Sequence, residues 1–497
     1  MIDNLLLGLS VAFTWHNLLF AFTGCMIGTA IGVLPGIGPL ATISLLLPIT
    51  FGLEPTTAII MLSGIYYGAQ YGGSTSAILL NLPGEITAVV TTLEGHQMAL
   101  RGRAGAALAV AAIGSFVAGT VATLIVAATG PLLTAAALSF GPAEYFSLIL
   151  LGLIITTVLS QGSVMKPLAM IALGVALGLV GTDVQSGQLR FSFDFPQLFE
   201  GVGFVAVAMG IFGISEIVRS LEHPESRNGS ISKVGSLWLT KEEVRRAAPS
   251  IARGTLLGSA LGILPGGGLA LSTFASYLME KKLSRYGHEF GTGAIEGVAG
   301  PESANNAASQ TSFIPMLTLG LPANAVMALM IGALMIQGIQ PGPTMVEQQP
   351  ELFWGLIVSM WVGNLMLLII NLPMIGVWVS LLKVPYRFLY PSILVFCAIG
   401  AYSVNNSIFD VYLTVLFGFV GYILGKLECE PAPLLIGFVL GPMLEEYLRR
   451  AMVLSRGDPM VFVERPMSAI LLAIATIALV AMLVPAIRRK KDEAIEE

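Results

Sequence analysis

The chain has 497 residues, of which 55% are hydrophobic and 11% charged, and its formal net charge is −5. Soluble globular proteins carry about 25% charged residues, so this composition excludes that class and predicts a polytopic membrane protein. Apolar stretches of about 20 residues, long enough for membrane-spanning helices, recur along the whole sequence.

The first predicted element is a hairpin built around a Pro-Gly break. Residues 15–34 lead to the break at Pro35, Gly36 and Gly38, and residues 41–50 lead away from it. Proline removes a backbone donor and ends a helix, and glycine tolerates the turn that follows. Residues 41–50 are too few to cross about 30 Å of hydrocarbon, so we predict that the hairpin tip lies inside the membrane. Three glycines at four-residue spacing precede the break and predict close packing on another helix: Gly24, Gly28 and Gly32.

The second predicted element, residues 56–82, ends in another break, Leu82-Pro83. Its small polar residues are Ser74, Thr75, Ser76 and Asn81. In lipid, an interrupted helix is tolerated only where protein or a water-filled cavity satisfies the freed backbone groups. Membrane crossings are then predicted at about 104–129, 132–160, 167–182 and 201–218, with an external loop at 181–196.

Positive charge sets the predicted orientation. No Lys or Arg occurs before Arg101, whereas residues 219–253 are rich in both. Cytoplasmic loops collect Lys and Arg, so we predict an external N-terminus, a cytoplasmic linker at 219–253 and a cytoplasmic tail from residue 488. Four arginines do not fit, because this topology places their loop outside: Arg449, Arg450, Arg456 and Arg465.

The break motif recurs in the second half of the chain, where Gly254 takes the place of Gly24. GVLPGIGP has its counterpart in GILPGGG, whose break residues are Pro265, Gly266, Gly267 and Gly268. A second Leu-Pro break, at 321–322, again follows a segment rich in Ser, Thr and Asn. The spacing between the two break prolines is 83 − 35 = 48 in the first copy and 322 − 265 = 57 in the second, which predicts a nine-residue insertion.

The repeat predicts the fold class. Further crossings at about 351–382, 388–404, 409–427, 431–447 and 467–487 give an all-α polytopic membrane protein with about 11 transmembrane helices plus two re-entrant hairpins. Five crossings and a hairpin precede the linker, so the second repeat starts from the opposite side and is inverted. The predicted divisions are a first membrane repeat at 1–218, the linker at 219–253, a second repeat at 254–447, and a C-terminal loop, last transmembrane helix and tail at 448–497.

Matched breaks in two halves point to a central binding site, as in secondary transporters with inverted repeats. Free N–H groups at the start of a broken helix suit a carboxylate, while hydroxyl and carbonyl oxygens suit an alkali cation. Besides the tip residues Pro35, Gly36, Gly38, Pro265, Gly266, Gly267 and Gly268, the substrate-binding candidates are Ser74, Thr75, Ser76, Asn305 and Asn306. The cation-binding candidates are Asn81, Ser303, Ser309 and Asn324.

Each of these residues also has a structural interpretation, because Gly, Pro and Ser are common in membrane helices, where Ser and Thr often bond their own backbone or a neighbouring helix. Glu85 and Glu302 lie beside the clusters and are candidates for a direct role, or else they sit at the water boundary. Neither polar cluster contains Lys or Arg, so an anion would depend on N–H groups, neutral donors and co-bound cations.

The sequence contains no nucleophile–base pair, metal-ligand set or phosphate loop. We therefore predict that the chain is not an enzyme. We also predict no cofactor and no metal beyond a coupling sodium ion.

The motifs GVLPGIGP, YYGAQYGGSTSAILLNLPGE, GILPGGG and PESANNAA resemble the large membrane subunit of the tripartite tricarboxylate transporters, the TctA-like family. The resemblance implies a secondary transporter in the bacterial inner membrane, importing tricarboxylates or related carboxylates such as citrate together with a cation, usually sodium. It also implies a small four-helix membrane partner and a periplasmic substrate-binding protein. The motif residues named above carry over as the site, and we expect no nucleic-acid partner.

Two other hypotheses stay open from the sequence. One is a channel, or a proton-coupled carboxylate transporter that works without a binding protein. The other is a scaffold or receptor derived from a transporter. The dense polar clusters argue against a scaffold, because a scaffold does not need buried polar groups.

Overall fold

The computed structural model describes residues 2–34, 38–159, 164–183, 185–222, 232–266, 268–382 and 386–483. These residues are almost entirely helical, and among them β1 (Gly181–Thr182) and β2 (Leu189–Arg190) form one short antiparallel hairpin. Four described helices are long and apolar enough to span a membrane: α2 (Trp15–Val33), α7 (Ala104–Ala137), α18 (Pro350–Asn371) and α21 (Ile408–Lys426). The prediction of an all-α membrane protein is confirmed.

The first half of the chain forms helices joined mostly by short loops. Besides α2 and α7 they are α1 (Ile2–Ala12), α3 (Pro39–Phe51), α4 (Pro55–Leu80), η1 (Ile86–Ala88), α5 (Val89–Thr91), η2 (Thr92–His96), α6 (Gln97–Leu100), α8 (Pro142–Leu159), α9 (Met165–Gly178), η3 (Pro196–Leu198), α10 (Phe204–Ala208), η4 (Met209–Ile214) and α11 (Ser215–Glu222).

The second half follows a similar succession of helices. Besides α18 and α21 they are α12 (Lys241–Leu261), α13 (Gly268–Leu283), η6 (Gly287–Glu289), α14 (Glu296–Thr311), α15 (Phe313–Leu319), α16 (Ala325–Ile336), α17 (Pro343–Gln348), α19 (Ile375–Leu381), α20 (Tyr386–Asn405), α22 (Ala432–Leu454), α23 (Val461–Glu464) and α24 (Pro466–Leu483).

Every predicted crossing coincides with at least one helix, but several boundaries differ from the prediction, among them the end of α7 and the start of α12. Helix α7 runs through Pro131 to Ala137, where the sequence predicted an end near residue 129. Helix α7 packs along α14 and α18, and Phe353 of α18 lies against Gly130, just before this proline. The predicted linker becomes helical at Lys241, because Thr240 and Glu243 form a capping box that starts α12 well before Gly254.

Glycines bring α2 and α4 into backbone contact. A Cβ built on Gly28 would lie 2.3 Å from the carbonyl oxygen of Ile65, and one built on Gly68 would lie 2.6 Å from that of Cys25. Such distances leave no room for a side chain, so the two helices pack through their backbones as the glycine spacing predicted.

Helices α12 and α14 repeat this contact in the second half. A Cβ on Gly258 would lie 2.2 Å from the carbonyl oxygen of Ala304. The contacting residues are 65 − 28 = 37 positions apart in the first half and 304 − 258 = 46 in the second. The difference of 46 − 37 = 9 equals the insertion inferred from the proline spacings, so it falls between the paired helices.

We expect Gly258→Ala to lower the free energy of unfolding by about 1–3 kcal/mol, because the added methyl forces α12 away from α14. Thermal unfolding of the purified chain in detergent measures the effect. Gly152→Ala on α8 is the matched control, since a Cβ there meets no atom within 4 Å. Equal melting of the two variants would contradict the backbone contact.

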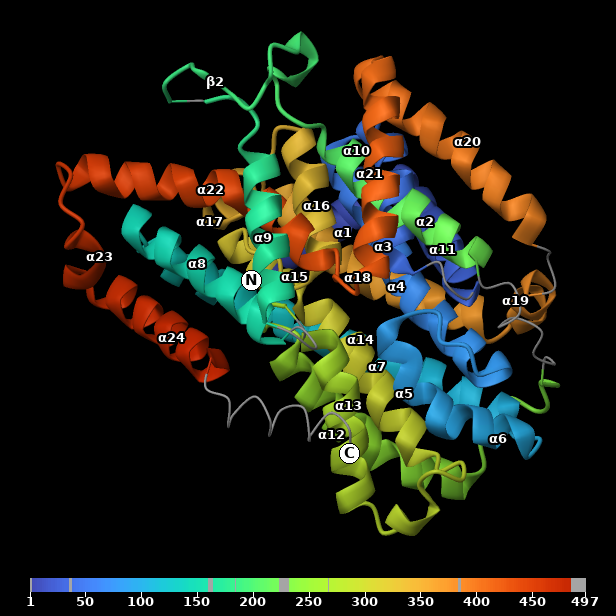
Figure 1. The fold of residues 1–497 in the computed structure, drawn as a ribbon. Helices are drawn as coiled ribbons and strands as arrows, with labels where there is room; N and C mark the ends of the chain where they lie inside the picture. The colour runs from blue at the N-terminus through green and yellow to red at the C-terminus, as the bar shows by residue number, and fades with distance from the viewer. Residues whose placement is uncertain are drawn as a thin grey trace.

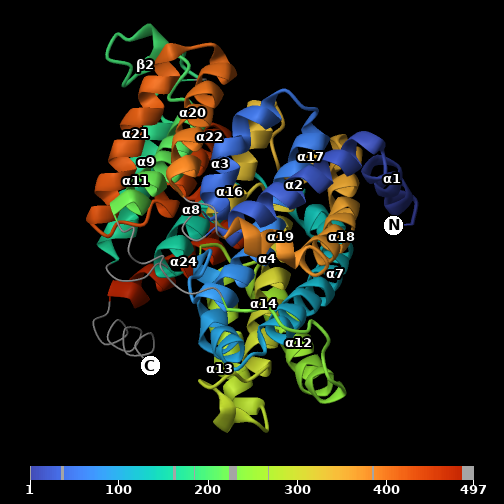
Figure 2. The same cartoon turned by 90° about the vertical axis from the view of Figure 1, so that its right-hand side faces the viewer.

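The helices form two groups that both views show. Helices α12, α13 and α14 lie together at the bottom of Figures 1 and 2, with α7 beside them. Helices α8, α9, α22 and α24 pack on one another at the left of Figure 1. The β1–β2 hairpin projects at the top of both figures, at the opposite end from α13.

Three of the four arginines that do not fit the predicted topology form ion pairs. Arg449 pairs with Asp183 of the β1–β2 hairpin and with Glu445. Arg450 pairs with Glu446, and Arg465 with Glu144. These carboxylates compensate the three charges locally, but the positive-inside pattern counts Lys and Arg rather than net charge, so this loop still departs from the predicted orientation.

Candidate functional site

Each Pro-Gly break lies against the Leu-Pro break of its own half. The N–H of Gly266 donates to the carbonyl oxygen of Ala323 at 2.8 Å. In the first half, the atom nearest to a Cβ built on Gly38 is the carbonyl oxygen of Gly84, at 3.8 Å. Gly84 and Ala323 directly follow the two Leu-Pro pairs, so in each half a glycine of the Pro-Gly break lies near the residue after the Leu-Pro pair.

The helices that follow the breaks pack crosswise between the halves. Helix α3, which follows the first Pro-Gly break, contacts α16, which follows the second Leu-Pro break. Helix α13, which follows the second Pro-Gly break, contacts η1 and α5, which follow the first Leu-Pro break. Each half therefore holds the break of the other half in place.

The two Leu-Pro breaks share one backbone conformation. The residue before each Leu-Pro pair is left-handed, with φ of 59° at Asn81 and 71° at Gly320. The residue before the next helix is extended, with φ and ψ of −156° and 169° at Glu85 and of −154° and 176° at Asn324. Glu85 and Asn324 thus occupy equivalent positions in the two halves.

Glu302 joins the polar clusters of the two halves. Its carboxyl group is buried, and Ser74 Oγ of α4 donates to Glu302 Oε2 at 2.6 Å. Thr91 Oγ1 of α5 donates to the other oxygen, Oε1. A second-half carboxyl group is therefore held by two first-half hydroxyl groups.

Two asparagines of α14 extend this network. Asn306 Nδ2 donates to Ser115 Oγ of α7 at 2.6 Å. Asn305 Nδ2 donates to Gln70 Oε1 of α4 at 2.9 Å, and Thr87 Oγ1 donates to the same oxygen at 3.2 Å. All of these side chains are buried. The interior between α4, α7 and α14 is thus polar, although the surrounding helices are apolar.

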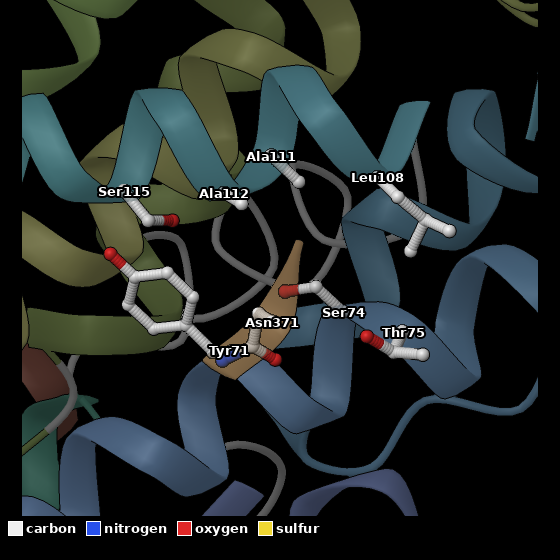
Figure 3. Close-up of a pocket in the computed structure, with 8 residues that line it drawn as sticks. All are labelled: Tyr71, Ser74, Thr75, Leu108, Ala111, Ala112, Ser115 and Asn371. Atoms are coloured by element: carbon white, nitrogen blue, oxygen red, sulfur yellow. The ribbon is translucent and has the colours of Figure 1, made fainter. Parts of the chain in front are cut away.

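A small cavity opens beside Ser74, between α4 and α7 (Figure 3). Its lining side chains come from α4, α7 and α18: Tyr71, Ser74, Thr75, Leu108, Ala111, Ala112, Ser115 and Asn371. Its volume of about 10 Å³ is at the lower limit for one water molecule. A tricarboxylate would not fit there without movement of the helices.

Comparison with known families decides the class of protein. The model of the Tripartite tricarboxylate transporter TctA family matches residues 18–436. The chain belongs to this family. TctA is a family of transporters rather than enzymes, and its members work in tripartite systems with other subunits and a binding protein.

Two curated relatives of this TctA-family chain come from Agrobacterium vitis. The "Uncharacterized 52.8 kDa protein in TAR-I ttuC' 3'region" is 58% identical over 497 residues, covering 100% of this chain and 99% of the relative. The "Uncharacterized protein in TAR-II ttuC' 3'region" is 60% identical over 240 residues, covering 48% of this chain and 99% of the relative. No solved structure matches the chain.

The structure brings some of the predicted site residues of this TctA chain together. Ser74 and Thr75 share the cavity, Ser74 reaches α14 through Glu302, and Asn305 and Asn306 bond first-half side chains. Ser76 is buried and lies near Gly84 at the first break. The described contacts of Gly38 and Gly266 are with the Leu-Pro breaks and with α8. Pro35, Gly36 and Gly267 lie outside the described residues.

The two tips differ in their need for glycine. Gly266 has a φ of +99°, and a Cβ there would lie 2.6 Å from the Cα atom of Thr156. A Cβ on Gly268 would lie 2.2 Å from the carbonyl oxygen of Leu261. Gly38 has a φ of −75° and open space around it. The second tip therefore requires its glycines for packing, and the described part of the first does not. Pro265 lies just before Gly266.

The four predicted cation ligands differ in their burial and in their hydrogen bonds. Ser303 and Ser309 are buried, and Ser309 Oγ donates to the carbonyl oxygen of Asn305. Asn324 caps α16 by accepting from the N–H of Met327, and its Nδ2 lies 3.5 Å from the Tyr66 hydroxyl. Asn81 is exposed at the end of α4, away from buried polar groups.

Sequence reasoning missed Gln70, Thr91 and Ser115, which bond the polar side chains of α14. Gln70 lies within the quoted motif YYGAQYGGSTS, four residues before Ser74 and hence on the same face of α4. Nothing in the sequence marked Thr91 or Ser115, because their partners lie in the other half of the chain.

Proposed function

We propose that this chain is the large membrane subunit of a binding-protein-dependent secondary transporter. It imports tricarboxylates or related carboxylates, such as citrate, by cation symport, with sodium as the coupling ion. The crossed packing of the two breaks around buried polar side chains carries this proposal, because matched broken helices at a repeat interface form transporter binding sites. Its partners are a small four-helix membrane subunit and a periplasmic substrate-binding protein, at the bacterial inner membrane.

The proposed topology is two inverted repeats with about 11 crossings and two re-entrant hairpins. The matched backbone contacts of α2 with α4 and of α12 with α14 support the repeat. The matched conformations of the two Leu-Pro breaks support it independently, since neither follows from the glycine pattern. The inversion rests on the charge distribution, with Lys and Arg absent before Arg101 and frequent in the linker.

The substrate would lie at the breaks and be held without ion pairs to basic side chains. Among the described residues, none of the ion pairs involves a residue of either polar cluster. Backbone N–H groups at the start of α3 and α13, with Asn and Ser donors, would then bind the carboxylates. Asn305 and Asn306 belong to the second half, and their amide groups donate to side chains of the first half.

Alternating access would explain why the site is closed. The cavity beside Ser74 has a volume of about 10 Å³, far too small for a carboxylate substrate. Opening toward one side at a time requires α3 and α13, with the tips that precede them, to move relative to the Leu-Pro breaks. The structure then corresponds to a closed state between two open ones.

Reconstitution tests the proposal. Proteoliposomes containing the chain and its small partner should take up labelled citrate or another carboxylate only when the substrate-loaded binding protein and an inward sodium gradient are both present. Uptake that persists without the binding protein and follows a pH gradient would favour the proton-coupled alternative. Gradient-independent flux that does not accumulate substrate would favour a channel.

A further inference from the structure

Two carboxyl groups lie in the polar interior without a positive partner. Both lie against the same turn of α4: a Cβ built on Gly73 would be 3.5 Å from Glu85 Cγ, and Ser74, the next residue, bonds Glu302. In the described part of the chain, neither belongs to any ion pair. Burying a charge is unfavourable unless it is paired, and two like charges close together are worse. This region therefore requires a proton or a bound cation, and the more so when an anionic substrate enters.

The two carboxyl groups differ in how well they are satisfied. Both oxygens of Glu302 accept hydrogen bonds, from Ser74 and Thr91. Glu85 Oε1 is a buried atom that, among the described residues, accepts no hydrogen bond. Glu85 is thus the carboxyl group with a free, solvent-shielded acceptor.

A second buried acceptor faces Glu85 from the other half. The Asn305 amide reaches the first Leu-Pro break through Gln70 Oε1, which also accepts from Thr87, two residues after Glu85. Asn305 is 1% exposed, and its Oδ1 also has no hydrogen-bond partner within the described residues. Its Nδ2 donates to Gln70 Oε1 at 2.9 Å, and the Nε2 of Gln70 likewise has no hydrogen-bond partner among the described residues. Two unpartnered oxygens, one from each half, therefore lie in the same buried polar region next to the first Leu-Pro break.

The equivalent position of the second half has no carboxylate with an unpartnered oxygen. Asn324 has the same backbone conformation as Glu85 but no charge. Its Oδ1 accepts from the N–H of Met327 at 3.0 Å, and its Nδ2 lies 3.5 Å from the Tyr66 hydroxyl. Of the two equivalent positions, only the first offers a carboxylate with a free oxygen. The two halves therefore differ in their capacity to bind a cation.

We propose that Glu85 and Asn305 are ligands of the coupling sodium ion, which binds between the first Leu-Pro break and α14. The inference rests on the proposed function and replaces Asn81, which is exposed, as the first-half ligand. Carboxylate and amide oxygens are the ligands that hard, strongly hydrated cations prefer. A sodium ion there cancels the charge of Glu85, so the substrate anion meets one carboxylate fewer. Sodium and substrate should therefore strengthen each other's binding.

A binding experiment on the purified full chain tests this assignment without its partners. Its thermal unfolding temperature is measured in increasing NaCl, with KCl added to keep the ionic strength constant. Sodium should raise the unfolding temperature up to a plateau, because a ligand that binds the folded state stabilises it. Glu85→Gln and Asn305→Ala should each raise the half-saturating sodium concentration about tenfold or more. Glu54→Gln, an exposed position just before α4, is the matched control and should leave it unchanged.

Three outcomes would overturn the assignment. A wild-type half-saturating concentration in Glu85→Gln would exclude Glu85, and the same shift caused by Glu302→Gln alone would move the site to Glu302. Equal stabilisation by sodium and potassium, with a dependence on pH that Glu85→Gln removes, would mean that Glu85 binds a proton. If Glu85→Gln does not fold, Glu85→Asp replaces it, because its shorter carboxylate should keep the fold and still shift the sodium concentration.

If the proposed transport function is wrong, the experiments would give a different result from that for a wrong sodium site. Sodium would then stabilise the wild type and not Glu85→Gln, yet the complete reconstituted system would take up no carboxylate. In the opposite case, sodium-driven uptake by the wild type with an unaltered sodium dependence in Glu85→Gln would keep the function and reject this site.

Discussion

Gly38→Val should reduce sodium-driven carboxylate uptake to the level of vesicles without the chain, while the protein remains folded and abundant in the membrane. Gly38 immediately precedes α3. A side chain introduced at this position would therefore face a carboxylate bound to the first N–H groups of that helix. The backbone at Gly38 has a φ of −75° and a ψ of 178°, which valine adopts readily, and the nearest atom to a Cβ is 3.8 Å away. Loss of transport would therefore reflect obstruction of the site rather than loss of the fold.

Gly52→Val is the matched control for this experiment. Gly52 follows the other end of α3, and a Cβ there meets no atom within 4 Å. It should leave both uptake and membrane abundance near wild-type values. Normal uptake by Gly38→Val would show that the first tip is only a structural turn.

Gly268→Val does not give the same information, although it is the sequence counterpart of Gly38→Val. A Cβ at Gly268 would lie 2.2 Å from the carbonyl oxygen of Leu261, so valine should destabilise the α12–α13 connection itself. We expect less folded protein in the membrane together with less uptake. The amount of chain in the membrane has to be measured beside uptake for every tip variant.

Glu94→Ala should lower the free energy of unfolding by on the order of 4 kcal/mol, the largest effect on stability that we expect for a single side chain. Glu94 lies in η2 of the first half and is 0% exposed. Its Oε2 accepts from the N–H groups of Gly293 at 2.7 Å and Ala294 at 2.9 Å. Its Oε1 accepts from the N–H of Gly291 and from the Tyr277 hydroxyl.

Alanine at this position would leave these four donors without their acceptor. The loop that leads into α14 would lose its attachment to the first half, and α14 carries the polar cluster with Asn305 and Glu302. Thermal unfolding of the full chain in detergent measures the loss. Tyr277→Phe, which removes one of the four donors, should cost about 1 kcal/mol. A stability of Glu94→Ala equal to that of Tyr277→Phe would contradict a role for the backbone contacts.

The sequence alone determined the membrane class and the helical fold, and it predicted the repeat. Composition excluded a soluble protein, and the glycine spacing predicted the α2–α4 and α12–α14 contacts because close helix packing needs a row of small residues. The proline spacings also predicted a nine-residue insertion, and the matched backbone contacts differ by the same nine positions.

Other features depended on how distant segments pack. Helix α7 continues through Pro131 because it packs along α14 and α18, which local sequence cannot show. Gly38 and Gly268 match in sequence, yet only Gly268 is confined by a neighbouring backbone. Arg449, Arg450 and Arg465 depart from the charge rule, and only the structure shows that each pairs with a carboxylate, in two of the three cases one from the first half of the chain.

The site itself was decided by the tertiary structure. The sequence marked Ser74, Asn305 and Glu302 as polar residues in apolar surroundings, but not which of them meet. Folding brings α4 against α14, so that Ser74 bonds Glu302 and Gln70 bonds Asn305, although the members of each pair belong to different halves of the chain. Which oxygen atoms stay without a donor, such as Glu85 Oε1, depends on these pairings, because a buried group finds partners only among the side chains that packing places beside it.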